Sequence, residues 1–184
     1  MRYEINATLS RVRLKVHASG MLSALGHSPT IVVREFSGHV NVPDDAPAGA
    51  SLELAIQTAA LAVGDDVKES DRREIEQTMR KDVLEVDSYP SITFVSSEVT
   101  GAAPGAGSFR VAIGGTLTLH GVSHPERIEA LVNVMGDRLT ANGQAVIRQS
   151  TYGITPVKIA GGALKLKDEI DLSFDIVARV NQSA

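Results

Sequence analysis

Five histidines are the residues in this chain best suited to metal chemistry, because a neutral imidazole is a common zinc ligand. They are His17, His27, His39, His120 and His124. His120 and His124 flank Gly121 at an expected turn, so the pair lacks the helical face that an i, i+4 zinc site needs. A site built from His27, His120 and His124 at one end of the fold stays open as an alternative. The weak spacing favours locally hydrogen-bonded histidines, and we assign no metal.

Arg148 and Tyr152 are the best polar candidates for ligand binding. A guanidinium can hold a carboxylate or a pyrophosphate with two parallel hydrogen bonds, so Arg148 at the mouth of a cavity would orient such a head group. An ion pair between Arg148 and Asp82 would instead fix the expected helix to the rest of the fold. The sequence leaves both interpretations open.

Motifs for covalent catalysis are missing from the sequence. It contains no cysteine, which excludes thiolate nucleophiles, disulfides and cysteine-based metal sites. It also contains no Gly-x-Ser-x-Gly motif. Gly114-Gly115 and Gly161-Gly162 neither open an expected helix nor precede a lysine, so they indicate a bulge and a turn rather than phosphate loops. We therefore expect no enzymatic activity and no cofactor.

The segment from Glu169 to Val180 shows most clearly which elements must position these residues. Apolar side chains occupy every second position, in the order Ile170, Leu172, Phe174, Ile176, Ala178 and Val180. Polar side chains occupy most positions between them, namely Glu169, Asp171, Ser173, Asp175 and Arg179. This period of two is typical of a long antiparallel strand with one buried face.

Similar alternation recurs along most of the chain. It predicts strands within residues 11–17, 31–42, 52–56, 92–99, 109–119, 128–132 and 139–147, with a weaker one at 155–159. The strand at 139–147 is expected to form a hairpin with the preceding one through a turn at 135–138. Either the segment 21–25 or the helix expected within 66–84 is expected to cover an opening of the barrel. We therefore expect one domain over residues 1–184, mainly β, folded as an antiparallel barrel of about eight strands.

The charge-rich segment 66–84 is different in kind. Ile75, Met79 and Val83 recur at intervals of four residues, which predicts a helix with a narrow apolar stripe, lying on a surface. Ser70 or Asp71 is the expected N-cap. This would be the one substantial helix of the fold.

Composition excludes several partners. The net charge is −4 and no run of Lys or Arg occurs, which excludes nucleic acid as a partner. Aromatic residues make up only 4% of the chain, so aliphatic side chains must fill the interior. No integral membrane segment and no export signal is visible, which predicts a cytoplasmic protein as the sequence is written, or a periplasmic or secreted one if an upstream signal was removed.

Several blocks of sequence, which occur in order along nearly the whole chain, resemble the YceI-like family. They are Tyr3-Glu4-Ile5, Ser10 to His17, Phe36-Ser37-Gly38, Arg80 to Val86, Tyr89 to Phe94, Gly115 to Ser123 and Ile147 to Ile154. The resemblance implies a lipocalin-like antiparallel β-barrel with a helix. It also implies that an isoprenoid or a fatty-acid derivative binds inside the barrel, with no catalytic residues.

Strand parity and this resemblance together predict the residues that line the barrel. They are Val12, Leu14, Phe36, Leu54, Ile56, Phe94, Leu117, Leu119, Leu172, Phe174 and Ile176, with Arg148 and Tyr152 as polar candidates. The expected function is non-enzymatic binding, transport or storage of an amphiphilic lipid in the barrel interior. A second copy of the chain, forming a homodimer, is a further candidate partner. One alternative is a histidine-ligated metal-dependent enzyme. The other is an interaction module with a filled core and a binding surface on the helix beside Ile75 and Met79.

Overall fold

The computed structural model describes residues 1–19, 28–43, 49–105, 107–159 and 164–180, whose strands all belong to one sheet. The strands are β1 (Arg2–Ile5), β2 (Arg11–Ser19), β3 (Thr30–Val33), β4 (Phe36–Asn41), β5 (Ser51–Gln57), β6 (Leu61–Val63), β7 (Ser91–Gly105), β8 (Ser108–Leu119), β9 (Val122–Met135), β10 (Arg138–Arg148), β11 (Lys158–Ile159) and β12 (Leu164–Val180). The helices are α1 (Glu69–Thr78), a π-helical turn (Met79–Val83) that continues it, and two 3-10 turns, η2 (Thr58–Ala60) and η4 (Gln149–Tyr152).

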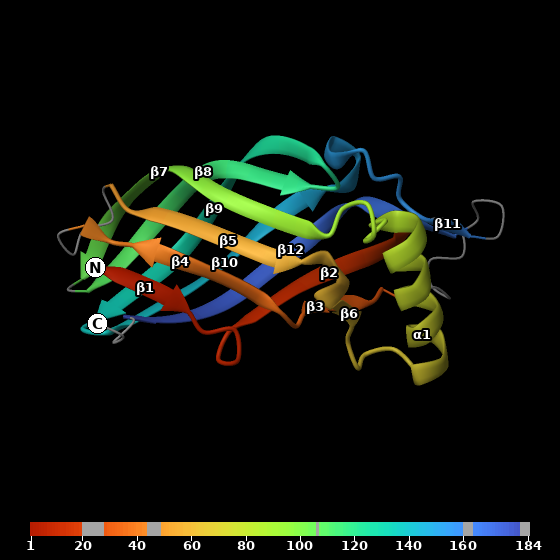
Figure 1. Ribbon diagram of the computed structural model, residues 1–184, viewed down its shortest axis with the longest axis horizontal. Helices are drawn as coiled ribbons and strands as arrows, with labels where there is room; N and C mark the ends of the chain where they lie inside the picture. The colour runs from red at the N-terminus through yellow and green to blue at the C-terminus, as the bar shows by residue number, and fades with distance from the viewer. Residues whose placement is uncertain (20–27, 44–48, 106, 160–163, 181–184) are drawn as a thin grey trace.

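The sheet closes on itself through β1. Tyr3 of β1 lies opposite Val40 of β4 on one side and opposite Val180 of β12 on the other. The ring therefore runs β1-β4-β5-β7-β8-β9-β10-β12 and back to β1, and its pairings are antiparallel (Figure 1). This confirms the expectation of a mainly β, eight-stranded barrel.

At three places the chain leaves one position in the sheet and continues as a new strand at another position. β1 is followed by β2, β3 is followed by β4, and β5 is followed by β6, with β2, β3 and β6 paired beside β12 in that order. The single strand expected over 31–42 is therefore two strands. Ser10 bridges the first of these breaks, because its hydroxyl donates to the backbone oxygen of Asn6 at 2.7 Å and accepts from the backbone nitrogen of Val177 at 2.9 Å.

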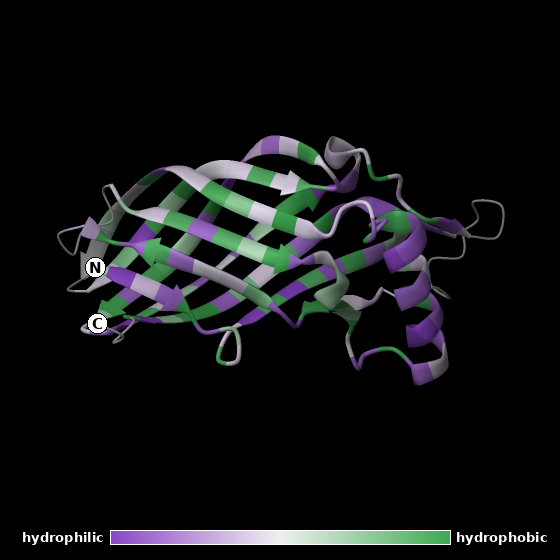
Figure 2. Ribbon diagram, in the orientation of Figure 1, coloured by the Kyte–Doolittle hydropathy of each residue, from purple (hydrophilic) through white to green (hydrophobic). Residues whose placement is uncertain are grey.

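Alternation along β12 sets which side chains face the barrel interior. Leu172 and Phe174 face inward, whereas Asp171 and Asp175 are exposed on the outer face. Figure 2 shows the same exchange of hydrophobic and hydrophilic residues along the strands of the barrel wall. A slip of one residue would turn these apolar side chains to water, so the register is strongly specified.

Two glycines leave room for aromatic rings inside the wall. A Cβ on Gly143 would lie 2.6 Å from Cζ of Phe174, and a Cβ on Gly115 would lie 2.5 Å from Cζ of Phe94. The register between β7 and β8 also shifts beside Gly115, where Ser97 of β7 is the extra residue. The double glycine therefore does accompany a bulge, although the inserted residue belongs to the neighbouring strand.

The helix stands across one end of the barrel, and the start of β1 and the end of β12 lie at the other end (Figure 1). Its apolar stripe, Ile75, Met79 and Val83, faces the barrel interior, and Met79 is buried. The expectation of a helix over this segment is confirmed. It covers one end of the barrel, which was one of the two placements expected, rather than the outer surface of the sheet (Figure 1). The predicted N-cap was wrong: Lys68 occupies that position without a side-chain hydrogen bond, and the hydroxyl of Ser70 donates to Asp71 instead.

α1 also covers a sheet edge. β6 pairs with β3 on one side only, which leaves the backbone N–H of Val63 without a strand partner. The carboxylate of Glu76 accepts that hydrogen bond at 2.9 Å. This hydrogen bond gives a partner to an edge N–H that would otherwise be buried without one. Within the described ranges no helix is long and apolar enough to cross a membrane.

Candidate ligand-binding cavity

A cavity of about 600 Å³ occupies the barrel interior. Its walls extend from Val134 and Leu139, near the chain termini, to Ile75 and Met79 on the helical end. Almost every lining side chain is aliphatic, and Phe94, Phe109 and Phe174 are the aromatic ones. The volume lies within the range of roughly 300–1,000 Å³ that is typical of small-molecule sites. The interior is therefore hollow, which removes the filled core that the interaction-module alternative requires.

The apolar residues predicted to line the barrel do line it, with one exception. Those that lie on the cavity wall are Val12, Leu14, Leu54, Ile56, Phe94, Leu117, Leu119, Leu172, Phe174 and Ile176. Phe36 is buried in the apolar cluster around the cavity without forming part of its wall. That these residues bind a ligand stays a prediction.

Arg148 lies on the outside of the barrel. Its neighbour Ile147 faces the cavity, so strand parity turns the guanidinium outward, and its side chain is 65% exposed. Arg148 donates to the carboxylate of Glu169 at 2.7 Å. No ion pair with Asp82 is found in the described part of the chain, so the pairing with Asp82 was wrong. Arg148 therefore neither lines the cavity nor fixes the helix.

Tyr152, the second polar candidate, is fully buried on η4 beside the cavity. Its hydroxyl donates to Oε1 of Glu126 at 2.7 Å, and Glu126 lines the cavity wall. Burial, followed by the hydrogen bond and negative charge of Glu126, raises the pKa of the Tyr152 hydroxyl above its ordinary value. The raised pKa keeps the Tyr152 hydroxyl protonated at neutral pH, as a donor to Glu126 requires.

Sequence reasoning missed Glu126. It precedes Ile128, Ala130 and Val132 at intervals of two residues, and all four side chains face the cavity. The available signal was a carboxylate on the apolar face of a strand, because strand parity alone places the Glu126 side chain in the barrel interior. Its side chain is 20% exposed, so a charged group has been placed in a mostly apolar wall.

The η4 turn that carries Tyr152 is held by Asp168 of β12. One oxygen of Asp168 accepts from the backbone nitrogen of Ser150 at 2.7 Å, and the other accepts from the Ser150 hydroxyl at 2.6 Å. These hydrogen bonds from Ser150, with a smaller contribution from the charge of Arg148, lower the pKa of the Asp168 carboxyl. Gln149, also on η4, donates its side-chain amide to the backbone oxygen of Lys167 at 3.0 Å.

Asp168→Asn is expected to destabilise the protein by about 1 kcal/mol at pH 7, the ordinary net contribution of such a hydrogen bond. Because the folded pKa of Asp168 lies below its unfolded value of about 3.9, its contribution is present above that pH and is lost as pH falls through the folded pKa. Urea unfolding at pH 7 and below pH 3 measures the difference, which should shrink in acid. Asp175→Asn, exposed on the same strand, is the matched control. A difference that is constant with pH would contradict this role.

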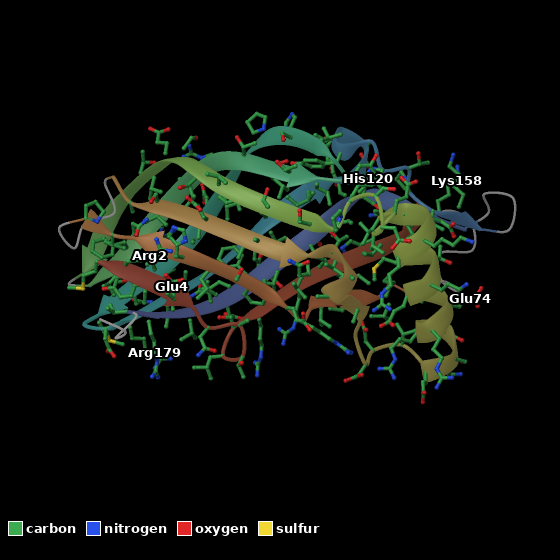
Figure 3. The ribbon with its side chains drawn as sticks, in the orientation of Figure 1. Arg2, Glu4, Glu74, His120, Lys158 and Arg179 are labelled. Carbon is green, nitrogen blue, oxygen red and sulfur yellow. The ribbon has the colours of Figure 1, made fainter. Side chains whose placement is uncertain are left out.

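Polar groups in the cavity wall gather at the helical end. Asp71, Glu74 and Thr78 of α1 line it there together with Glu126 and Gln149, whereas Ser51 lies toward the other end. In Figure 3, Glu74 lies on α1 at this end and Arg2 lies near the termini. None of the described lining residues is Lys or Arg, and the segments outside the described ranges contain neither type. The polar end of the cavity is therefore acidic.

The histidines are engaged separately. Nε2 of His120 lies 2.8 Å from Oε2 of Glu85, and its ring packs against Tyr89 with centroids 4.2 Å apart. Nδ1 of His124 lies 3.8 Å from Oε1 of Glu126. Among described residues, no group of three His, Cys, Asp or Glu side chains could hold a metal ion. His27 and the segment Met21–Leu25 lie outside the described residues.

The closed eight-stranded barrel with an apolar cavity defines a lipocalin-like β-barrel, a fold that encloses one small ligand. Within this class the chain belongs to the YceI-like family, whose domain model matches residues 3–178. Among curated relatives, UPF0312 proteins of Pseudomonas savastanoi pv. phaseolicola and Pseudomonas syringae pv. syringae are 25% identical over 152 residues, covering 79% of this chain and 72% of theirs.

Solved structures share the fold at low sequence identity. BcnA of Burkholderia cenocepacia matches with a TM-score of 0.71 and 22% identity, over 94% of this chain and 98% of that one. A polyisoprenoid binding domain from Saccharophagus degradans matches with a TM-score of 0.67 and 17% identity, over 97% and 98%. The YCEI protein of Campylobacter jejuni matches with a TM-score of 0.61 and 18% identity, over 83% and 85%.

Proposed function

We propose that this protein is a non-enzymatic carrier or store for an amphiphilic lipid, isoprenoid-like or fatty-acid-like, whose apolar chain occupies the barrel. The observation that carries the proposal is the cavity of about 600 Å³ with its aliphatic wall. Ten buried methylenes would contribute roughly 8 kcal/mol. After association costs of several kcal/mol, micromolar binding is within reach.

The relatives support the same class of ligand. The Saccharophagus degradans domain, described as polyisoprenoid-binding, shares the barrel over nearly its whole length. An elongated cavity lined from end to end by Val, Leu and Ile suits a flexible chain better than a flat aromatic molecule. The wall therefore favours a long aliphatic or isoprenoid tail.

An interaction module is a weaker interpretation of the helix. Met79 is 9% exposed and Ile75 lines the cavity, so the apolar stripe of α1 already has a place inside the barrel. The outward residues of the helix include the ion pair between Arg73 and Glu69, which is typical of a solvated face.

Native mass spectrometry of the freshly purified protein tests the proposed function. We expect a fraction with a lipid-sized mass increment, and solvent extraction should release the same compound. The stripped protein should then bind one equivalent of the neutral fluorescent probe N-phenyl-1-naphthylamine, with a dissociation constant in the micromolar range. A protein that carries no lipid and gives no probe fluorescence would overturn the proposal.

A further inference from the structure

We propose that the cavity selects an amphiphile with a positively charged head, an ammonium group on an apolar chain, and that Glu126 binds that head. This inference rests on the proposed function and specifies the ligand of the same cavity. It arises from the charged side chains of the cavity wall, which among the described residues are carboxylates only.

The wall offers three carboxylates, Asp71, Glu74 and Glu126, at the helical end. No Lys or Arg is among the described residues that line the cavity with them, and the segments outside the described ranges contain neither type. Arg148, for which binding an anionic head was one of two interpretations, points into solvent. A carboxylate or phosphate head would therefore lie among like charges without a cationic partner, an arrangement that electrostatics disfavours.

Glu126 is the best placed of the three carboxylates. Its side chain is 20% exposed, whereas Glu74 is an exposed residue at the rim and Asp71 has other interactions. A carboxylate has about four acceptor sites, and Tyr152 uses one of them on Oε1. The other sites suit an ammonium, which has donors only. Tyr152 meanwhile fixes the position of the carboxylate in advance.

Two neighbours add acceptors to the same end of the cavity. Gln149 uses its amide nitrogen on the backbone oxygen of Lys167, which leaves the amide oxygen as an acceptor. Thr78 of α1 contributes a hydroxyl to the wall. Nδ1 of the His124 ring lies 3.8 Å from Oε1 of Glu126. The assay is run at pH 8, where an alkylammonium is charged.

Displacement of N-phenyl-1-naphthylamine by decylamine, decanol, decanoate and decyl phosphate at pH 8 tests the head preference with the chain held constant. We expect decylamine to bind about tenfold more tightly than decanol, and both anions to bind at least tenfold more weakly than decanol. Decanol equal to decylamine, or either anion equal to decanol, overturns the head preference while leaving the proposed function standing. If none of the four compounds binds and the probe does not bind either, the proposed function is overturned.

Glu126→Gln assigns the preference to this side chain. The amide keeps an acceptor for Tyr152 but loses the charge, so we expect decylamine to lose about tenfold in affinity while decanol is unchanged. Glu129→Gln, exposed on the outer face of the same strand, is the matched control and should change neither. An unchanged decylamine affinity in Glu126→Gln overturns the assignment to Glu126. The series on the unaltered protein tests the charge preference even if this variant folds poorly.

Discussion

Replacing Ala141 with tryptophan is expected to lower the affinity for a long-chain ligand about a hundredfold while the barrel stays folded. Ala141 lies on β10 opposite Ile176 and Val132, and its side chain lines the cavity. An indole there would take space otherwise used by roughly four methylenes, a loss of about 3 kcal/mol of ligand burial. Titration with N-phenyl-1-naphthylamine and displacement by decanol measures the effect.

Ala112→Trp is the matched control. Ala112 lies on β8 between Val111 and Ile113, both of which line the cavity, so its own side chain points outward. We expect unchanged affinity in this variant. Circular dichroism and the urea midpoint establish that both variants are folded. An Ala141→Trp protein that is folded and binds with undiminished affinity would show that the chain does not occupy the barrel.

Tyr3→Ala is expected to lower the free energy of unfolding by about 3–5 kcal/mol, the usual effect of deleting a buried aromatic side chain. Tyr3 is fully buried and packs with Val42, Leu139 and Ala178 at the terminal end of the barrel. It lies on β1, the strand that joins β4 to β12 and so closes the ring. For a chain of this length the melting temperature should fall by about 10 °C.

Tyr3→Phe separates packing from hydrogen bonding. The Tyr3 hydroxyl donates to the backbone oxygen of Gly136 at 2.9 Å, so its removal should cost about 1 kcal/mol. Arg2→Ala, on the exposed neighbour, should cost less than 0.5 kcal/mol, because an exposed ion pair with Glu4 contributes little. A Tyr3→Ala protein with an unchanged urea midpoint would contradict the importance of β1 for closure.

The barrel wall was predictable from the sequence because each strand has one dry face. In β12 the alternation from Ile170 to Ile176 identifies the strand, its inner face and four of the lining residues. The same parity rule applied to β10 would have placed Arg148 outside, since Ile147 precedes it on the inner face. In these strands the alternation of apolar residues predicts which side chains face the interior, because burial of one face decides the register.

The position of the helix could not be predicted in the same way. The stripe of Ile75, Met79 and Val83 requires an apolar surface to cover, but the sheet exterior and the open end of a barrel both meet that need. At the end of the barrel the stripe faces the cavity, and Glu76 accepts a hydrogen bond from Val63 at the unpaired edge of β6. That edge exists only because β5 and β6 are separate strands, and the break follows from pairings between distant parts of the chain.

Methyl NMR titration with decylamine tests the central claim, that an apolar chain lies inside the barrel, most directly. The methyl groups of Leu54, Leu117 and Ile176 line the cavity, whereas Val95 and Val146 are 48% and 52% exposed. We predict that the inner methyls shift and show nuclear Overhauser contacts to ligand methylenes, and that the outer ones do not. Contacts confined to the outer methyls, with the inner ones unchanged at saturation, would contradict the account.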